Sequence, residues 1–186
     1  MKRILMVFIA ILFLFGCSNA KSSVEPGLKL REKLLSGNGC KFTAVITADY
    51  GDVTQTFSMD CAADADGNID FTVLEPEAIS GITGKISNEG GRLTFDDHAL
   101  AFSLLADGQI APVSSPWIVL KTLRSGYIRA CETKKEGAHL IIDDSYEDDA
   151  LQLDIYLSSD HIPVQADILW RGKRYLSVAV KNFQFL

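Results

Sequence analysis

The order of apolar and polar residues predicts a chain built mainly from β-strands. From residue 40 to residue 73, apolar side chains alternate with polar or β-branched ones, as in strands that bury one face. A turn at Tyr50-Gly51 would fold this segment into a hairpin with Phe42 opposite Met59 and Ala44 opposite Phe57. The same register places residues 40 and 61, both cysteines, opposite each other on one face.

More strands are expected along the middle of the chain. Residues 69–73 follow the turn signal Asp66-Gly67, and a second hairpin is predicted from residues 82–87 and 92–96 around Gly90-Gly91. The alternation continues through Leu100, Phe102 and Leu104.

The most regular strand pairing is predicted near the C-terminus, where two alternating segments flank the loop 158–163. The expected pairs are Leu157 with Val164, Ile155 with Ala166, Leu153 with Ile168 and Leu151 with Trp170. The last strand, residues 175–185, follows Gly172-Lys173. A two-residue turn there would set Ile168 against Ser177 and a three-residue loop against Val178, so we expect a longer loop or a bulge.

Two segments have helical patterns. Residues 28–35 form a short amphipathic helix that Gly37 can end. Residues 116–125 form a second helix, with Ser115 as its cap, Pro116 in its first turn and Gly126 at its end. This helix is too apolar for a surface position, so it must pack against other apolar groups. Its apolar residues are Trp117, Ile118, Val119, Leu120 and Leu123.

The N-terminus has the pattern of an export signal. Lys2 and Arg3 precede an apolar run from residue 4 to residue 15, which is shorter than the ~20 residues that span a bilayer. Residues 14–17 (LFGC) resemble the lipobox of bacterial lipoproteins, which makes Cys17 the expected lipid anchor; the alternative is an ordinary cleaved signal with an incidental cysteine. We therefore expect a signal peptide at 1–16, a tether at 17–25 and a domain at 26–186.

Charge limits the possible partners. Removal of residues 1–16 takes away two basic residues and no acidic one, so the net charge moves from −6 to −8. An acidic domain lacks the electrostatic pattern of a nucleic-acid-binding protein, and we expect no such partner. Membrane contact is expected through lipidated Cys17.

Several segments resemble the LolA-like superfamily of lipoprotein carriers, which includes sigma-factor regulators and mycobacterial acyl-binding lipoproteins. The segments are 71–77 (FTVLEPE), 79–82 (ISGI), 91–96 (GRLTFD), 115–117 (SPW), 153–157 (LDIYL) and 162–167 (IPVQAD). The resemblance implies an α+β, mainly β fold: a strongly curved antiparallel sheet, or half-open barrel, closed by an N-terminal helix and one or two internal helices. It also implies an apolar cavity for acyl chains. Germination lipoproteins of spore formers, in which this fold serves a partner enzyme, are a related possibility.

Seven apolar residues are candidates for the lining of such a cavity, although each is also compatible with an ordinary core. They are Phe42, Phe57, Met59, Phe71, Phe95, Phe102 and Trp117.

The cysteines have a separate interpretation. Because thiols can oxidise in an exported protein, Cys40 and Cys61 are candidates for a disulfide that closes a loop of about 20 residues and contributes roughly 3 kcal/mol. The alternative is two buried thiols. Cys131 is expected to be a buried strand residue.

Catalytic and metal-binding patterns are not found in the sequence. The histidines at 98, 139 and 161 lie in separate segments without a nucleophile motif, so we predict neither an enzyme nor a cofactor. The acidic residues at 64–75 have the wrong glycine position for a calcium loop and read as a hairpin turn. A second acidic group, residues 143–149, reads as a solvated loop or a cation or partner site.

Two functions remain from the sequence. The leading hypothesis is a non-enzymatic anchored lipoprotein that holds a lipid or other apolar ligand beneath the helix of Trp117. The alternative is a protein-interaction lipoprotein that supports a partner enzyme in envelope or spore-cortex remodelling.

Overall fold

The structure is a computed structural model that describes residues 24–96, 98–102, 105–106 and 109–186. These residues form an 11-stranded antiparallel sheet, a two-stranded sheet, two α-helices and two 3₁₀-helices. The helices are α2 (Glu25–Ser36), η2 (Glu77–Ile79), η3 (Pro112–Ser114) and α3 (Ser115–Ser125). The strands are β1 (Gly39–Asp49), β2 (Thr54–Asp64), β3 (Ile69–Glu75), β4 (Thr83–Ser87), β5 (Gly90–Phe95), β6 (His98–Phe102), β7 (Leu105–Ala106), β8 (Gln109–Ile110), β9 (Tyr127–Lys134), β10 (Gly137–Asp143), β11 (Leu151–Ser158), β12 (Pro163–Trp170) and β13 (Lys173–Phe185).

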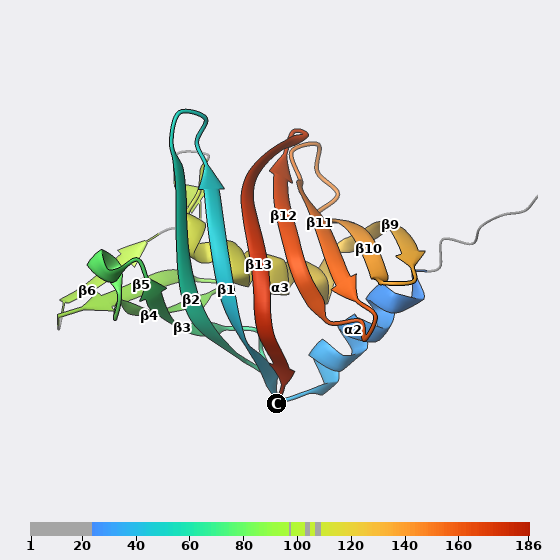
Figure 1. The fold of residues 1–186 in the computed structure, drawn as a ribbon, viewed down its shortest axis with the longest axis horizontal. Coiled ribbons are helices and arrows are strands. Elements are labelled where there is room, and N and C mark those ends of the chain that lie inside the picture. The colour runs from blue at the N-terminus through green and yellow to red at the C-terminus, as the bar shows by residue number, and fades with distance from the viewer. Residues whose placement is uncertain (1–23, 97, 103–104, 107–108) are drawn as a thin grey trace, which may run out of the picture.

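The large sheet consists of two meanders joined at their centre. Its strand order is β6-β5-β4-β3-β2-β1-β13-β12-β11-β10-β9, so the first and last strands of the chain pair with each other. The sheet does not close, because β6 and β9 remain as edges. It bends around α3, which crosses behind β1 and β13 in Figure 1, while α2 lies near β9 and β10. The expected fold class, a mainly β half-open barrel with helices on one face, is confirmed.

The core lies between the sheet and α3. Alternate residues of β1, from Phe42 through Ala44 and Ile46 to Ala48, are buried, as the alternation predicts. From α3, all residues at positions 115–120 are buried, which confirms that this helix packs against apolar groups.

Reciprocal hydrogen bonds fix α3 against α2. The guanidinium of Arg31 donates to the carbonyl oxygens of Leu123 and Gly126, at 2.8 and 2.6 Å. Arg124 donates in return to the carbonyl of Leu34 at 2.7 Å. The last carbonyls of a helix lack partners within it. Each of these two side chains therefore caps the C-terminal end of the other helix. The predicted Ser115 cap is wrong: residue 114 holds the cap position, without a capping side-chain bond, and the Ser115 hydroxyl donates to the carbonyl of residue 112.

The register of the first hairpin differs from the prediction by two residues. Phe42 lies opposite Cys61, and Ala44 lies opposite Met59. The turn is a four-residue loop, 50–53, rather than a tight turn at Tyr50-Gly51. In this loop the Asp49 carboxylate accepts a hydrogen bond from the amide of residue 51 at 2.8 Å. A shift of two residues preserves the face of every side chain and changes only its partner.

The C-terminal strands follow the prediction closely. Leu151, Leu153 and Ile155 have the expected partners, whereas Leu157 lies opposite Pro163 because a bulge begins at Tyr156. The expected irregularity before the last strand is also present. A register shift between residues 168 and 169 of β12 accompanies the turn into β13. In the second hairpin, the turn is at residues 88–89 rather than at Gly90-Gly91.

Candidate functional site

Four of the seven predicted cavity residues belong to the packed core. Phe42, Met59, Phe71 and Trp117 are each less than 8% exposed, at 7, 0, 4 and 5%. They lie on the inner face of the sheet or on the helix that covers it. The structure places these four residues in one core cluster.

Among the described residues, α3 packs closely on the sheet and leaves a small gap. Between the helix and the sheet there is an apolar gap of about 10 Å³, lined by Val119, Leu120 and Leu123 from α3 and by Phe42 and Phe183 from the sheet, among others. A gap of this size holds about one water molecule, whereas a cavity of about 150 Å³ is needed for a ligand as small as benzene. An acyl chain has no room there unless α3 moves away from the sheet.

The other three predicted residues lie elsewhere. Phe57 is partly buried beside a hollow of about 470 Å³ that also contacts Pro76. Phe95, with 47% of its surface exposed, and Phe102 belong to the outer hairpin β5–β6. These three residues do not line a common cavity with the first four.

Phe95 and Phe102 form part of an apolar surface, which we call the wing patch, with Leu93 and Leu100. Leu93 lies opposite Leu100, and Phe102 lies opposite Gly91, so all four side chains share one face of β5–β6. This is the inner face, because Leu93 is also opposite Gly84, which is opposite Phe71 of the core. Leu100 is 66% exposed. The patch is thus the continuation of the core face beyond the part that α3 covers.

A glycine gives the wing patch its shape. A Cβ atom at Gly91 would lie 2.0 Å from the ring of Phe102, so the ring occupies the space that any other residue would fill. The alternation at 93–95 and 100–102 was visible in the sequence, but it did not indicate that Phe95 and Leu100 would stay exposed.

The two cysteines of the proposed disulfide are free thiols in the structure. Cys40 lies opposite Ala63 and Cys61 opposite Phe42, so the two are diagonal neighbours, and the predicted register that set them directly opposite each other is wrong. Diagonal positions are farther apart than the ~4 Å that a disulfide requires between Cβ atoms. Burial raises the pKa of Cys40 to about 11 and raises that of Cys61 further. Both are therefore protonated and unreactive at neutral pH. Cys131 is a buried strand residue, as predicted.

The predicted signal peptide and lipid anchor, Cys17, lie outside the described residues. Among the residues that are described, none of the helices combines the length and the apolar character needed to cross a bilayer.

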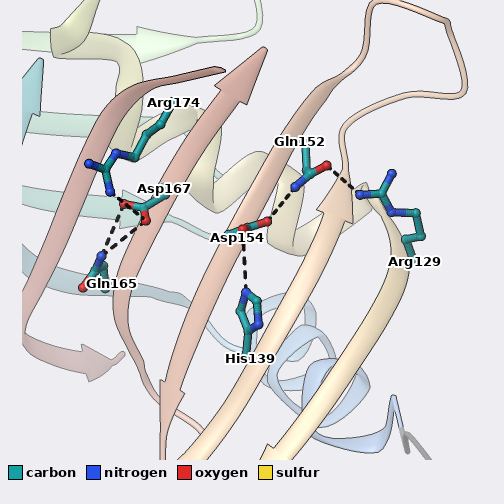
Figure 2. A network of polar contacts seen from close by, with 7 residues as sticks. All are labelled: Arg129, His139, Gln152, Asp154, Gln165, Asp167 and Arg174. Atoms are coloured by element: carbon teal, nitrogen blue, oxygen red, sulfur yellow. Dashed lines mark hydrogen bonds and ion pairs between the residues drawn. The ribbon is translucent and has the colours of Figure 1, made fainter. Parts of the chain in front are cut away.

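A polar network lies on the outer face of strands β9 to β13, as Figure 2 shows. Asp154 accepts a hydrogen bond from Gln152 at 2.8 Å, and Gln152 accepts one from Arg129 at 2.6 Å. His139 lies 3.8 Å from the Asp154 carboxylate and stacks on Tyr156, with 4.5 Å between ring centroids. The His139 Nε2 atom is buried and makes no hydrogen bond.

A second carboxylate lies directly opposite the first. Asp167 pairs with Asp154 across β11 and β12 and is only 8% exposed. Its oxygens accept hydrogen bonds from Ser177 at 2.6 Å and Gln165 at 3.3 Å. Arg174 lies 3.6 Å away, and Figure 2 shows Arg174 and Gln165 on either side of the Asp167 carboxylate. These donors offset the repulsion between the two carboxylates. The predicted register of these strands already placed the two residues opposite each other, but sequence reasoning did not single them out.

The hydrogen bonds of this network join side chains on β9, β11, β12 and β13. The Asp167 oxygens are occupied by protein donors, and no serine, cysteine or lysine nucleophile is bonded to His139 in the described residues. In the same residues, no group of three His, Cys, Asp or Glu side chains is placed to hold a metal ion.

The acidic residues near position 64 form the predicted hairpin turn. The Asp64 carboxylate accepts hydrogen bonds from the amides of Asp66 and Asn68, at 3.0 and 2.9 Å, and from the Asn68 side chain at 2.9 Å. Slight burial raises the pKa of Asp64, but these hydrogen bonds outweigh it and hold the pKa below its usual value.

No protein-family model and no curated protein matches the chain. Solved structures that resemble it include an uncharacterized conserved protein from Thermus thermophilus, with 12% identity, 88% of this chain and 87% of that one covered, and a TM-score of 0.49. A LolA superfamily protein from Nitrosomonas europaea has 9% identity, coverage of 90% and 94%, and a TM-score of 0.47. A putative outer membrane lipoprotein-sorting protein domain from Vibrio parahaemolyticus has 10% identity, coverage of 90% and 93%, and a TM-score of 0.46.

The superfamily that the sequence resembles is thus among the structural neighbours. This likeness concerns the fold. It says nothing of the germination branch.

Proposed function

We propose that this protein is an exported, lipid-anchored and non-enzymatic interaction module, whose wing patch contacts a partner protein of the cell envelope. The observation that supports this proposal is the contrast between two parts of one inner face. Beneath α3 the face is filled, with a gap of about 10 Å³, whereas at β5–β6 it leaves Phe95 and Leu100 47% and 66% exposed.

Contiguous exposure of large apolar residues has an energetic consequence. Single exposed apolar side chains are normal on protein surfaces, but groups of neighbours usually mark interaction sites. The cross-strand pair Leu93–Leu100 holds part of this surface in a fixed geometry before binding, which reduces the entropy cost of association. A partner that covers Leu100 and Phe95 would remove two large apolar side chains from water, which favours association.

The proposed interaction module and a lipid carrier would bind an apolar group at different places, the first at the wing patch and the second beneath α3. A ligand beneath α3 would have to displace Leu120 and Leu123, which are 3% and 4% exposed, from contact with the sheet. The wing patch needs no such rearrangement. The partner class that we propose is an enzyme of envelope or cortex remodelling, the alternative hypothesis of the sequence analysis.

Site-specific crosslinking tests the proposal. A photo-reactive amino acid at position 100 should yield one discrete protein adduct in membranes of the native cell, and Phe95→Asp should abolish that adduct. The matched control is the same probe at Tyr146, which is 87% exposed in the loop between β10 and β11. This control should not yield the adduct. Absence of an adduct at position 100, or the same adduct at both positions, would refute the interaction surface.

Native mass spectrometry separates this proposal from the lipid hypothesis. Protein exported in its own host and purified without detergent should carry no acyl ligand besides its covalent anchor. A co-bound lipid at unit stoichiometry would contradict the filled interior. Cys17→Ser should release the folded domain from the membrane, and retention of that variant would contradict the anchor.

A further inference from the structure

A hollow lies on the outer face of the sheet, away from the wing patch. It has a volume of about 720 Å³ and spans β13 and β1 to β5. The residues whose side chains point outward around it are Lys41, Thr43, Asp60, Ala62, Asp70, Thr72, Thr83, Lys85, Arg92, Thr94, Asn182 and Gln184.

Strand pairing arranges most of these side chains in two parallel rows. One row runs across the strands as Lys41, Ala62, Asp70, Lys85 and Arg92, each residue opposite the next.

The neighbouring row is rich in hydroxyl groups. It runs as Thr43, Asp60, Thr72, Thr83 and Thr94, again with each residue opposite the next. Adjacent strands are about 4.8 Å apart, so the last three members present hydroxyl groups at a regular spacing.

The hollow has the opposite charge to the chain as a whole. It contains three basic and two acidic side chains, in a protein with net charge −6. Asp60 accepts a hydrogen bond from Thr43 at 2.7 Å, and Asp70 lies 3.9 Å from Lys85 in an exposed contact that contributes little. Lys41 and Arg92 make no hydrogen bond or ion pair with any residue that the structure describes. Their charges are available to a ligand.

The spacing of the cations indicates the form of that ligand. Lys41 and Arg92 are separated by four strand intervals, or at most about 19 Å along the sheet. A single small anion cannot contact both, and a flat membrane surface cannot enter a hollow. A chain that carries repeated negative charges can follow the row.

We propose that this hollow binds an anionic polymer whose charged groups are phosphates linked by polyol units. The cations would contact the phosphates, and the threonine row, with Asn182 and Gln184, would exchange hydrogen bonds with hydroxyl groups. An acidic peptide fits less well. Among the described lining residues on the outward faces of the strands, Ala62 is the one apolar residue, and its methyl group offers no pocket for peptide side chains. The inference does not depend on the wing patch or its partner.

Titration of the purified full-length mature protein with a glycerol phosphate oligomer tests this inference. Calorimetry should detect binding that weakens as salt is raised, because exposed charges are screened. An uncharged dextran of similar length should not bind. In nuclear magnetic resonance spectra, the amide signals of Thr72, Thr83 and Thr94 should shift on addition of the oligomer.

The variant Lys41→Gln/Arg92→Gln should bind the oligomer about tenfold more weakly. Lys135→Gln, which removes one charge from an exposed turn beyond β9, is the matched control and should bind like the wild type. Thermal unfolding curves of both variants verify folding. Absence of binding by the folded wild type, an equal loss in the Lys135→Gln control, or equally tight binding of polyglutamate would overturn the proposal.

Discussion

The filled interior beneath α3 can be tested by the substitution Leu120→Ala. Leu120 is 3% exposed and lines the gap between helix and sheet. Loss of three buried carbon atoms costs roughly 2.4 kcal/mol in transfer free energy, at about 0.8 kcal/mol each. If ~50 Å³ of the removed volume stays open, the cavity adds about 1.2 kcal/mol. The free energy of unfolding should therefore fall by about 3.5 kcal/mol.

Urea and thermal unfolding measure this loss. For a domain of this size, 1 kcal/mol corresponds to a shift of about 2–4 °C, so the melting temperature should fall by about 7–14 °C. Leu35→Ala provides the matched control, because Leu35 lies on the other helix and is 55% exposed. Its cost should be below about 0.5 kcal/mol.

A small effect at Leu120 would refute the reasoning. If Leu120→Ala cost less than about 1 kcal/mol, the helix would not be packed against a filled core. An open or ligand-holding cavity would then be the better description, and the lipid hypothesis would regain its site.

Three further predictions follow from other parts of the molecule. Cys40 and Cys61, whose pKa values are raised by burial, should resist alkylation at pH 8 in the folded protein and react fully in denaturant; mass spectrometry of alkylated samples measures this, and thiols that never react would indicate a disulfide. Gly84→Ala would place a Cβ atom 2.4 Å from the Arg92 carbonyl oxygen. The substitution should lower the free energy of unfolding, measured by urea titration, by about 1–3 kcal/mol. An unchanged free energy of unfolding would show that β4 and β5 are not packed as described. Because the folded-state pKa of Asp64 is depressed, its contribution to stability is present above the unfolded pKa near 3.9 and is lost as the pH falls through the folded value. Asp64→Asn should therefore flatten the acid limb of the pH–stability curve, and an unchanged acid limb would argue against the turn hydrogen bonds.

Much of the local structure could be predicted because it depends on neighbouring residues. The period of two in residues 151–157 and 164–170 determined which side chains face the core, and three of the four predicted pairs are correct. The first hairpin illustrates the limit. Its faces are correct and its register is wrong by two, because the Asp49 carboxylate and the backbone stabilise a loop longer than the sequence signal at Tyr50-Gly51 suggests.

The candidate site was less predictable, because it depends on distances between segments far apart in the chain. Phe42 and Phe95 have the same alternating pattern, yet the first is core and the second is exposed. Whether such a residue is buried or exposed depends on whether α3 covers the inner face of the sheet at that position. The two polar rows of the outer face also required the five strands β1 to β5 to be paired in one register.

The sequence by itself determined that the chain forms alternating strands, that the helix at 116–125 must be buried, and that the N-terminus has an export and lipidation pattern. These are properties of short segments, where period and composition act directly. Only the tertiary structure decided that β1 pairs with β13, that the space beneath α3 is filled, and that the wing patch and the outer hollow remain open. Cavities are small differences between the volume that a curved sheet encloses and the volume of the side chains inside it, and such a difference is set by the whole fold.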